Sequence, residues 1–166
     1  MRNVVIVAAL AGGLAGALLT LLLTDQGAGT EADTQHPAPA LEILSTPEQD
    51  ALQLPFAEGV RVGNIIYLSG QMGVAPGSMQ LVEGGIQAET RQTLLNIKDS
   101  LERYGSALDQ VVKCTVFLHD MAEWPLMNEV YVEIFAGHRP ARSALGASGL
   151  ALNGRVEIEC MALART

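Results

Sequence analysis

Basic residues are scarce in this chain. Lys and Arg together number 10 against 18 Asp and Glu, so the formal net charge of the 166 residues is -8. Binding to a phosphate backbone needs a basic footprint. The acidic balance therefore argues against a nucleic acid as the main partner, although a local basic patch would be compatible with it.

Motifs for metal binding and for nucleophilic catalysis are missing as well. The chain has no C-x-x-C pair and no Cys/His cluster at metal-ligand spacing, and His36, His119 and His138 are scattered. Ser69 is no candidate nucleophile, because neither a G-x-S-x-G turn nor a histidine motif accompanies it. The sequence therefore predicts no metal and no cofactor.

Only two cysteines are present, Cys114 in VVKCTVFL and Cys160 in VEIECMAL. Both lie in apolar runs that are typical of strands, and free Cys is among the most buried residue types. We therefore expect two reduced, buried side chains. A disulfide is the alternative, because an exported domain would permit one.

The one long apolar run stands at the N-terminus. Residues 4–23, VVIVAALAGGLAGALLTLLL, carry no charge, and about 20 apolar residues can span a bilayer as a helix. The apolar core of a cleaved signal peptide usually has only about 7–15 residues. We therefore expect residues 1–24 to form a membrane anchor. A signal peptide cleaved near residues 27–29 is the alternative.

Charges around this segment predict its orientation. Arg2 precedes the apolar run, and Asp25, Glu31 and Asp33 follow it, which favours a cytoplasmic N-terminus and a domain on the extracytoplasmic, periplasmic side. If the segment is cleaved, the domain is exported as a soluble protein. Residues 25–40 are small, polar and proline-containing, as in a flexible linker, so the folded unit is expected at 41–166.

Within that unit the apolar periodicity changes between strands and helices. Val60 and Val62 begin a strand pair that turns at Gly63-Asn64 and continues over residues 65–71. A helix is predicted over 86–104, with Thr90, Leu94, Ile97 and Leu101 along one stripe and Gly105 as its C-terminal cap.

The second half of the unit repeats this alternation. The largely apolar residues 111–119 predict a strand that is buried on both faces. A second helix begins near Glu123, and we expect Trp124, Leu126 and Met127 to lie in the core. ARSALGA and RVEIECMALA supply two last strands. The fold is α+β, with two helices on one face of a mixed sheet. The other face must then meet water, a lumen or another subunit.

Four ordered segments resemble the RidA/YjgF family of imine deaminases over about residues 42–165. These segments are SGQMGV (69–74), TRQTLLNIK (90–98), NEVYVEIF (128–135), and PARSALGA (140–147) together with VEIE (156–159). The resemblance implies a chorismate-mutase-like subunit that forms homotrimers with the sheets inward. It also implies active sites in the clefts between subunits.

Site residues follow from the same resemblance. Arg142 is similar to the arginine that holds the substrate carboxylate, and Glu157 to the glutamate associated with the catalytic water. Ser69 and Gly70 resemble residues that line the pocket, and Asn128 resembles a polar group of the pocket or interface.

Two further pocket positions depart from the family pattern. Phe56 stands where many members have tyrosine, and Ala144 stands where many have cysteine. The first change removes a hydroxyl that could orient substrate or water. The second removes a thiol and leaves the backbone N–H and C=O of residue 144 in place.

The reaction that the resemblance implies is hydrolysis of a reactive 2-enamine or 2-imino acid to a 2-keto acid and ammonia. An arginine can pair bidentately with the carboxylate, while a glutamate positions water and exchanges its proton. Arg142 and Glu157 would converge if their strands pair as a hairpin. A structural ion pair between Arg142 and a glutamate that holds two subunits together is the other interpretation.

Alternative functions share the same fold. A non-catalytic trimer could bind a small carboxylate or another metabolite outside the cytoplasmic membrane, which Phe56 and the predicted export favour. A chaperone-like role rests only on the resemblance to some relatives, and a ribonuclease role fits the net charge of -8 poorly.

Overall fold

A mixed β-sheet organises residues 38–165, the part of the chain that the computed structural model describes. The strands are β1 (Leu41–Leu44), β2 (Gly59–Val62), β3 (Ile65–Leu68), β4 (Gln71–Met72), β5 (Val111–Leu118), β6 (Ala141–Gly146) and β7 (Val156–Leu163). The helices are α1 (Pro47–Ala51), α2 (Gly85–Arg103) and α3 (Trp124–Phe135), and short 3-10 turns cover Leu108–Gln110, Met121–Glu123 and Ala151–Asn153.

The predicted membrane segment and most of the predicted linker lie outside these residues. Residues 38–40 have no regular structure. None of the helices within 38–165 is long and apolar enough to cross a bilayer.

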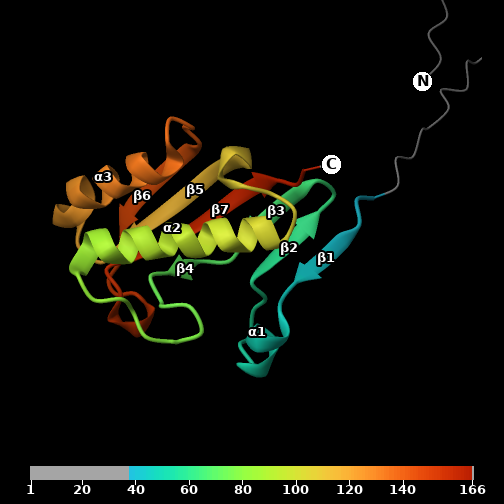
Figure 1. Ribbon diagram of the computed structural model, residues 1–166, viewed down its shortest axis with the longest axis horizontal. Coiled ribbons are helices and arrows are strands. Elements are labelled where there is room, and N and C mark those ends of the chain that lie inside the picture. Colours follow the sequence, from blue (N-terminus) through green and yellow to red (C-terminus); the bar gives the residue numbers. More distant parts are fainter. Residues whose placement is uncertain (1–37, 166) are drawn as a thin grey trace, which may run out of the picture. The chain divides into compact units, whose positions relative to one another are not determined.

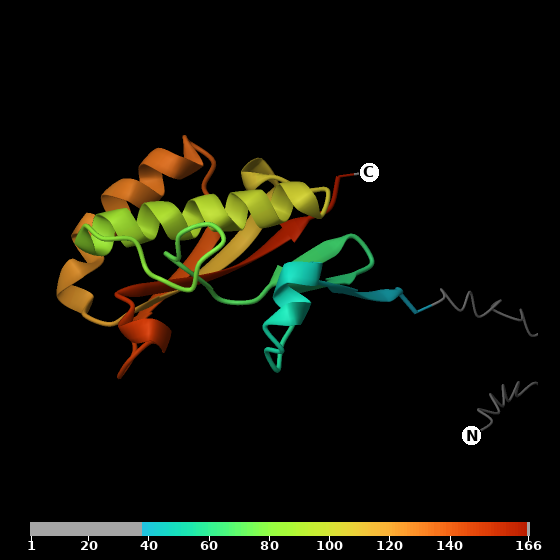
Figure 2. The ribbon, with the colours of Figure 1, turned by 60° about the horizontal axis from the view of Figure 1, so that its bottom comes forward.

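The strands follow the order β1-β2-β3-β7-β5-β6, and β4 pairs with β7 beyond β3. Only β5 and β6 are parallel, and α3 forms the crossover between them. Figures 1 and 2 show α2 and α3 side by side on one face of the sheet. The predicted α+β fold with two helices on one face is confirmed.

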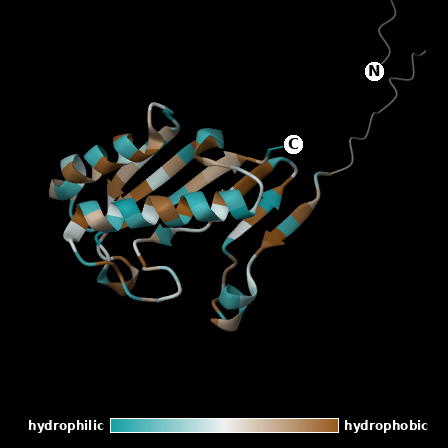
Figure 3. Ribbon diagram, in the orientation of Figure 1, coloured by the Kyte–Doolittle hydropathy of each residue, from teal (hydrophilic) through white to brown (hydrophobic). Residues whose placement is uncertain are grey.

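The core lies between these helices and the sheet. The predicted stripe on α2 is confirmed, because Thr90, Leu94, Ile97 and Leu101 are fully buried. Figure 3 shows the corresponding alternation of polar and apolar residues along the helix. Gly105 ends it with a φ of +77°, a conformation that glycine adopts without steric cost.

Helix α3 buries a narrower stripe than the sequence predicts. Met127 and Tyr131 are buried, as expected for a side of the helix that faces the sheet. Trp124 is 43% exposed and Leu126 is 45% exposed, so their prediction as core residues was wrong. Leu126 lies off the buried stripe, and Trp124 occupies the first helical turn.

The predicted hairpin around Gly63-Asn64 is confirmed. Val62 pairs with Ile65 across a two-residue turn, and Gly63 has a φ of +60°, which suits the first position of such a turn. By contrast, the predicted burial of both faces of β5 was wrong. Val112 is exposed on this strand, because all of the longer helices cover the other face (Figure 2).

The strands β6 and β7 do not form the hairpin that the sequence suggested. Strand β5 lies between them, parallel to β6 and antiparallel to β7. The crossover through α3 places β6 on the outer edge of β5, which leaves the inner edge of β5 for β7. The short connection between β6 and β7 therefore spans a third strand.

The two cysteines are joined rather than reduced. Cys114 of β5 lies directly opposite Cys160 of β7, with their Cα atoms 4.1 Å apart, and the side chains form a disulfide. Both residues are buried as predicted, but the expectation of free thiols was wrong. The antiparallel register brings them together, and 46 residues separate them in sequence.

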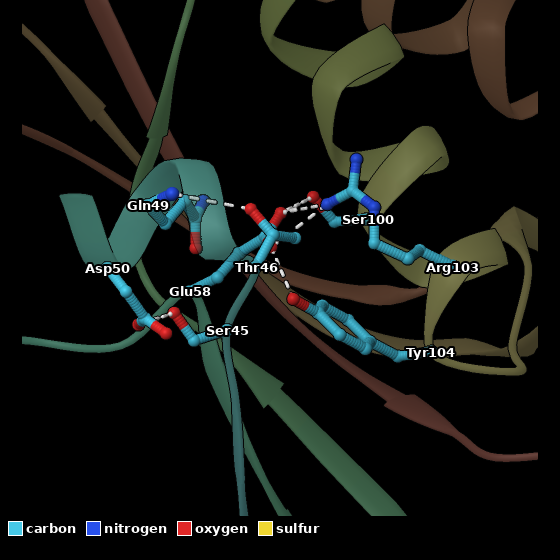
Figure 4. Close-up of polar contacts among 8 residues, drawn as sticks. All are labelled: Ser45, Thr46, Gln49, Asp50, Glu58, Ser100, Arg103 and Tyr104. Atoms are coloured by element: carbon cyan, nitrogen blue, oxygen red, sulfur yellow. Dashed lines mark hydrogen bonds and ion pairs between the residues drawn. The ribbon is translucent and has the colours of Figure 1, made fainter. Parts of the chain in front are cut away.

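A buried carboxylate fastens β2 to the end of α2 (Figure 4). Glu58 accepts hydrogen bonds from the hydroxyls of Ser100 and Tyr104, and both of its oxygens lie 3.0 Å from Nη1 of Arg103. Burial, followed by the hydrogen bond to Glu58, raises the pKa of Tyr104 to about 12. Tyr104 is therefore a hydrogen-bond donor at neutral pH.

Replacing Glu58 with alanine is expected to destabilise the domain by about 2 kcal/mol, because the partner hydroxyls lose their acceptor inside the structure. Urea unfolding monitored by circular dichroism measures this change. Glu102→Ala, which removes an exposed carboxylate from the same helix, should cost less than about 0.5 kcal/mol. Equal losses of unfolding free energy in the two variants would contradict a stabilising role for the hydrogen bonds of Glu58.

Candidate active site

Arg142 lies on the helix side of the edge strand β6. Its guanidinium carbon is 4.5 Å from the centre of the Tyr131 ring on α3, a cation–π contact. Asn128, one turn before Tyr131, is half-buried on the same helix, and Ala144 packs against the core two residues beyond Arg142. Arg142 has no ion-pair partner within residues 38–165 of the single chain, and an ion pair with a glutamate of another subunit stays a prediction.

Glu157 lies on β7 beside the segment that joins β3 and β4. A Cβ atom on Gly70 would stand only 1.9 Å from Oε1 of Glu157. A side chain at residue 70 would therefore displace the carboxylate. The structure thus brings two of the predicted residues together, and it explains the glycine by a close approach.

Ser69 has a structural connection to the loop that carries Phe56. Its backbone N–H donates to the carbonyl of Glu58 at 2.9 Å, and its hydroxyl donates to the carbonyl of Ala57 at 2.7 Å. Phe56 itself is 59% exposed. Because Ser69 directly precedes Gly70, these bonds hold the Phe56 loop near the Glu157 carboxylate.

The two halves of the predicted site lie on opposite faces of the sheet. Arg142 stands opposite Cys114, and Glu157 stands opposite Phe117, on the same strand β5. Cys114 and Phe117 are three residues apart, and side chains alternate between faces along a strand. Arg142 therefore points to the helix side and Glu157 to the open side, so one chain cannot use both on one small substrate.

A separate polar cavity of about 620 Å³ lies between α1, α2 and the loop of residues 74–79. None of the predicted site residues lines it. Its wall includes Glu58, which accepts hydrogen bonds from Ser100 and Arg103, two other residues of the wall. Since these charged and polar groups already have partners, we assign the candidate site to the two half-sites and not to this cavity.

Comparison with known proteins supports the family resemblance that the four sequence segments indicate. Residues 48–164 match the family model described as Endoribonuclease L-PSP, and solved structures of RidA and YjgF proteins share the fold. The chain belongs to the RidA/YjgF family.

Three relatives illustrate the similarity to this family. A Mus musculus protein named 2-iminobutanoate/2-iminopropanoate deaminase is 40% identical over 122 residues, which cover 74% of this chain and 90% of the relative. The YjgF gene product from E. coli has a TM-score of 0.68 at 32% identity, covering 75% and 99% of the two chains. RidA from an Antarctic Psychrobacter has a TM-score of 0.63 at 38% identity, covering 66% and 89%.

Tyr131 is a residue of the site that the resemblance to the RidA/YjgF family did not indicate. Burial raises the pKa of its hydroxyl to about 12, although the charge of Arg142 acts in the opposite direction. The neutral ring therefore offers a flat surface for the guanidinium at physiological pH. The signal in the sequence was the spacing in NEVY, which places Tyr131 one turn after Asn128 on the same helix face.

The surroundings of the Glu157 carboxyl group favour its protonated form. Burial, and secondly the negative charge of Glu159, raise its pKa above the ordinary value for glutamate. A carboxylate with a raised pKa is a stronger base than a free one. Glu159, two residues further along β7, thus acts on the carboxyl group of Glu157 through its charge.

Glu159→Gln is expected to lower the pKa of Glu157, because it removes a like charge while burial stays the same. A carbon-13 NMR titration of the side-chain carboxyls measures the midpoint directly. Glu129→Gln, on the exposed side of α3, should leave that midpoint unchanged. A midpoint that does not move in Glu159→Gln would rule out the coupling.

Proposed function

We propose that this protein hydrolyses 2-imino acids, or the enamines from which they form, to 2-keto acids and ammonia. Membership of the RidA/YjgF family and a relative with a deaminase name at 40% identity support the reaction class. The observation that carries the proposal for this chain is the presence of an arginine without an ion-pair partner in residues 38–165 and a glutamate with a raised pKa.

Arg142 holds the substrate by its carboxylate. The planar guanidinium presents paired N–H donors that match the two carboxylate oxygens. Stacking on Tyr131 limits the rotation of the side chain and so reduces the entropy lost when the substrate binds. The C=N carbon, next to the carboxylate, then stays open to attack.

Glu157 serves as the proton carrier. Its carboxylate accepts a proton from water as the water oxygen bonds to the C=N carbon, and the electrons of the C=N bond move to nitrogen. The same carboxyl returns this proton to nitrogen, which gives a tetrahedral carbinolamine. Glu157 then takes the proton of the new hydroxyl group and passes it to nitrogen as the C–N bond breaks, so that ammonia leaves and the carbonyl forms. No redox change occurs, and the carboxylate is regenerated.

The active cleft forms between two copies of the chain. Arg142 and Glu157 face opposite sides of one sheet, so one copy supplies Arg142 and its neighbour supplies Glu157 to the cleft between them. A homotrimer with sheets inward, as is typical of the family, also covers the open face. That face exposes apolar side chains of Ile43, Tyr67 and Met161, as expected for an interaction surface.

A binding protein without turnover is the second candidate. Phe56 lacks the hydroxyl that tyrosine would supply, and the Ser69 bonds hold its loop near Glu157. A cleft without that hydroxyl could retain the carboxylate through Arg142 and fail to orient water. Saturable binding of a 2-keto acid in the absence of imine hydrolysis would favour this function over the first.

Arg142→Ala is expected to lower kcat/KM for ammonia release from a freshly generated 2-imino acid by at least about 100-fold, because a charge-assisted bidentate contact is lost. Release is measured with a coupled ammonia assay. Arg139→Ala removes an exposed arginine from the connection before β6 and should retain wild-type activity. Equal rates for wild type and Arg142→Ala would contradict the proposed deaminase.

Subunit mixing tests the shared cleft. Arg142→Ala and Glu157→Gln chains are each expected to be inactive, and their joint refolding should restore activity. In a random 1:1 assembly about one interface in four receives both intact residues, so about a quarter of wild-type activity is expected. Mixing Arg142→Ala with the Arg142→Ala/Glu157→Gln double variant is the control and should restore none. Absence of rescue in the first mixture would contradict a cleft built from two chains.

A further inference from the structure

The disulfide between Cys114 and Cys160 has no part in the proposed reaction. It joins the middles of the adjacent strands β5 and β7 on the face that α2 and α3 cover. The two residues are 1% and 2% exposed. It differs from a surface disulfide that closes a loop, because it connects two strands that backbone hydrogen bonds already pair.

Burial decides what kind of disulfide this is. A disulfide is reduced or exchanged only when a thiolate reaches one of its sulfur atoms. The layer of α2 and α3 above Cys114 and Cys160 denies that access in the folded domain. No group of three His, Cys, Asp or Glu side chains in residues 38–165 is arranged to hold a metal ion. Cys114 and Cys160 are therefore not ligands of such a group within these residues.

We propose that the Cys114–Cys160 bond is a permanent structural staple, formed by an external disulfide oxidant while the chain folds. The two thiols lose two protons and two electrons, and the oxidant's disulfide takes them up to become two thiols. This exchange must occur before α2 and α3 close over β5 and β7. The folded domain then keeps the bond irrespective of the thiols around it.

The staple assigns the domain to an oxidising compartment. Thiol-reducing systems keep cysteines reduced in most cytosolic proteins, whereas disulfides persist outside the cytoplasm. The sequence independently predicts export from the apolar residues 4–23 and the charges around them. The inference does not depend on the proposed deaminase activity, because it rests on the register and burial of the two cysteines.

The closing experiment uses the full-length chain produced by secretion into an oxidising compartment. After denaturation without reductant, an alkylating reagent should modify neither cysteine, and prior reduction should expose both to the reagent. Native protein should lose the bond to a water-soluble reductant at least about 100-fold more slowly than denatured protein, because access requires unfolding. Alkylation of both residues without reductant, or equal rates of reduction, would overturn the proposal.

Thermal unfolding provides the second measurement. Reduction after unfolding and refolding should lower the Tm of the wild-type chain by roughly 10 °C, since the bond closes a long loop in the unfolded chain. The Cys114→Ala/Cys160→Ala double variant should melt at the same temperature with and without reductant. If that variant does not fold, the comparison of oxidised and reduced wild type still decides, and equal Tm values there would refute the staple.

Discussion

Strand β5 is the element on which the arrangement of this domain depends. It pairs with β6 on one edge and with β7 on the other, so the strands of both candidate residues take their register from it. The alternation of side chains along β5 then decides that Arg142 and Glu157 point to opposite faces. A slip of β7 by one residue would reverse the face of Glu157 and separate the two cysteines.

Buried polar contacts complete the open-side half of the site. Glu58 connects β2 to the C-terminal end of α2, and Ser69 connects the end of β3 to the loop of Phe56. Both contacts act on the same stretch of chain, at residues 57–58. Residues 57–58 are therefore bonded both to the end of α2 and to Ser69. Gly70, the residue after Ser69, lies close to the Glu157 carboxylate.

Local features of this fold were predictable from the sequence, and features that depend on strand order were not. The stripe of α2 and the turn at Gly63 follow from spacing and backbone preference within a few residues, and both are present. The disulfide and the separation of Arg142 from Glu157 depend on β5 entering between β6 and β7. No periodicity within one segment records which strand will be its neighbour, and a hairpin between consecutive strands is the simplest expectation.

The residues of the candidate site were accordingly predictable from the sequence, but their positions relative to one another were not. The resemblance to the RidA/YjgF family selected Gly70 and Glu157, which the structure brings together. It did not select Tyr131, because a buried aromatic residue on a helix is ordinarily part of a core. Its second role, beneath a guanidinium, depends on how α3 crosses the edge of β6.

If Arg142 and Glu157 act together as proposed, their opposite orientation leaves the single subunit an incomplete catalyst. A freshly folded chain carries every residue of the proposed site and yet no whole cleft, so assembly itself would be the activating step. Below the dissociation constant of the oligomer, the rate would fall more steeply than the protein concentration. A chain attached to a membrane would meet its partners in two dimensions, and its local surface density would then determine how much of the population is active.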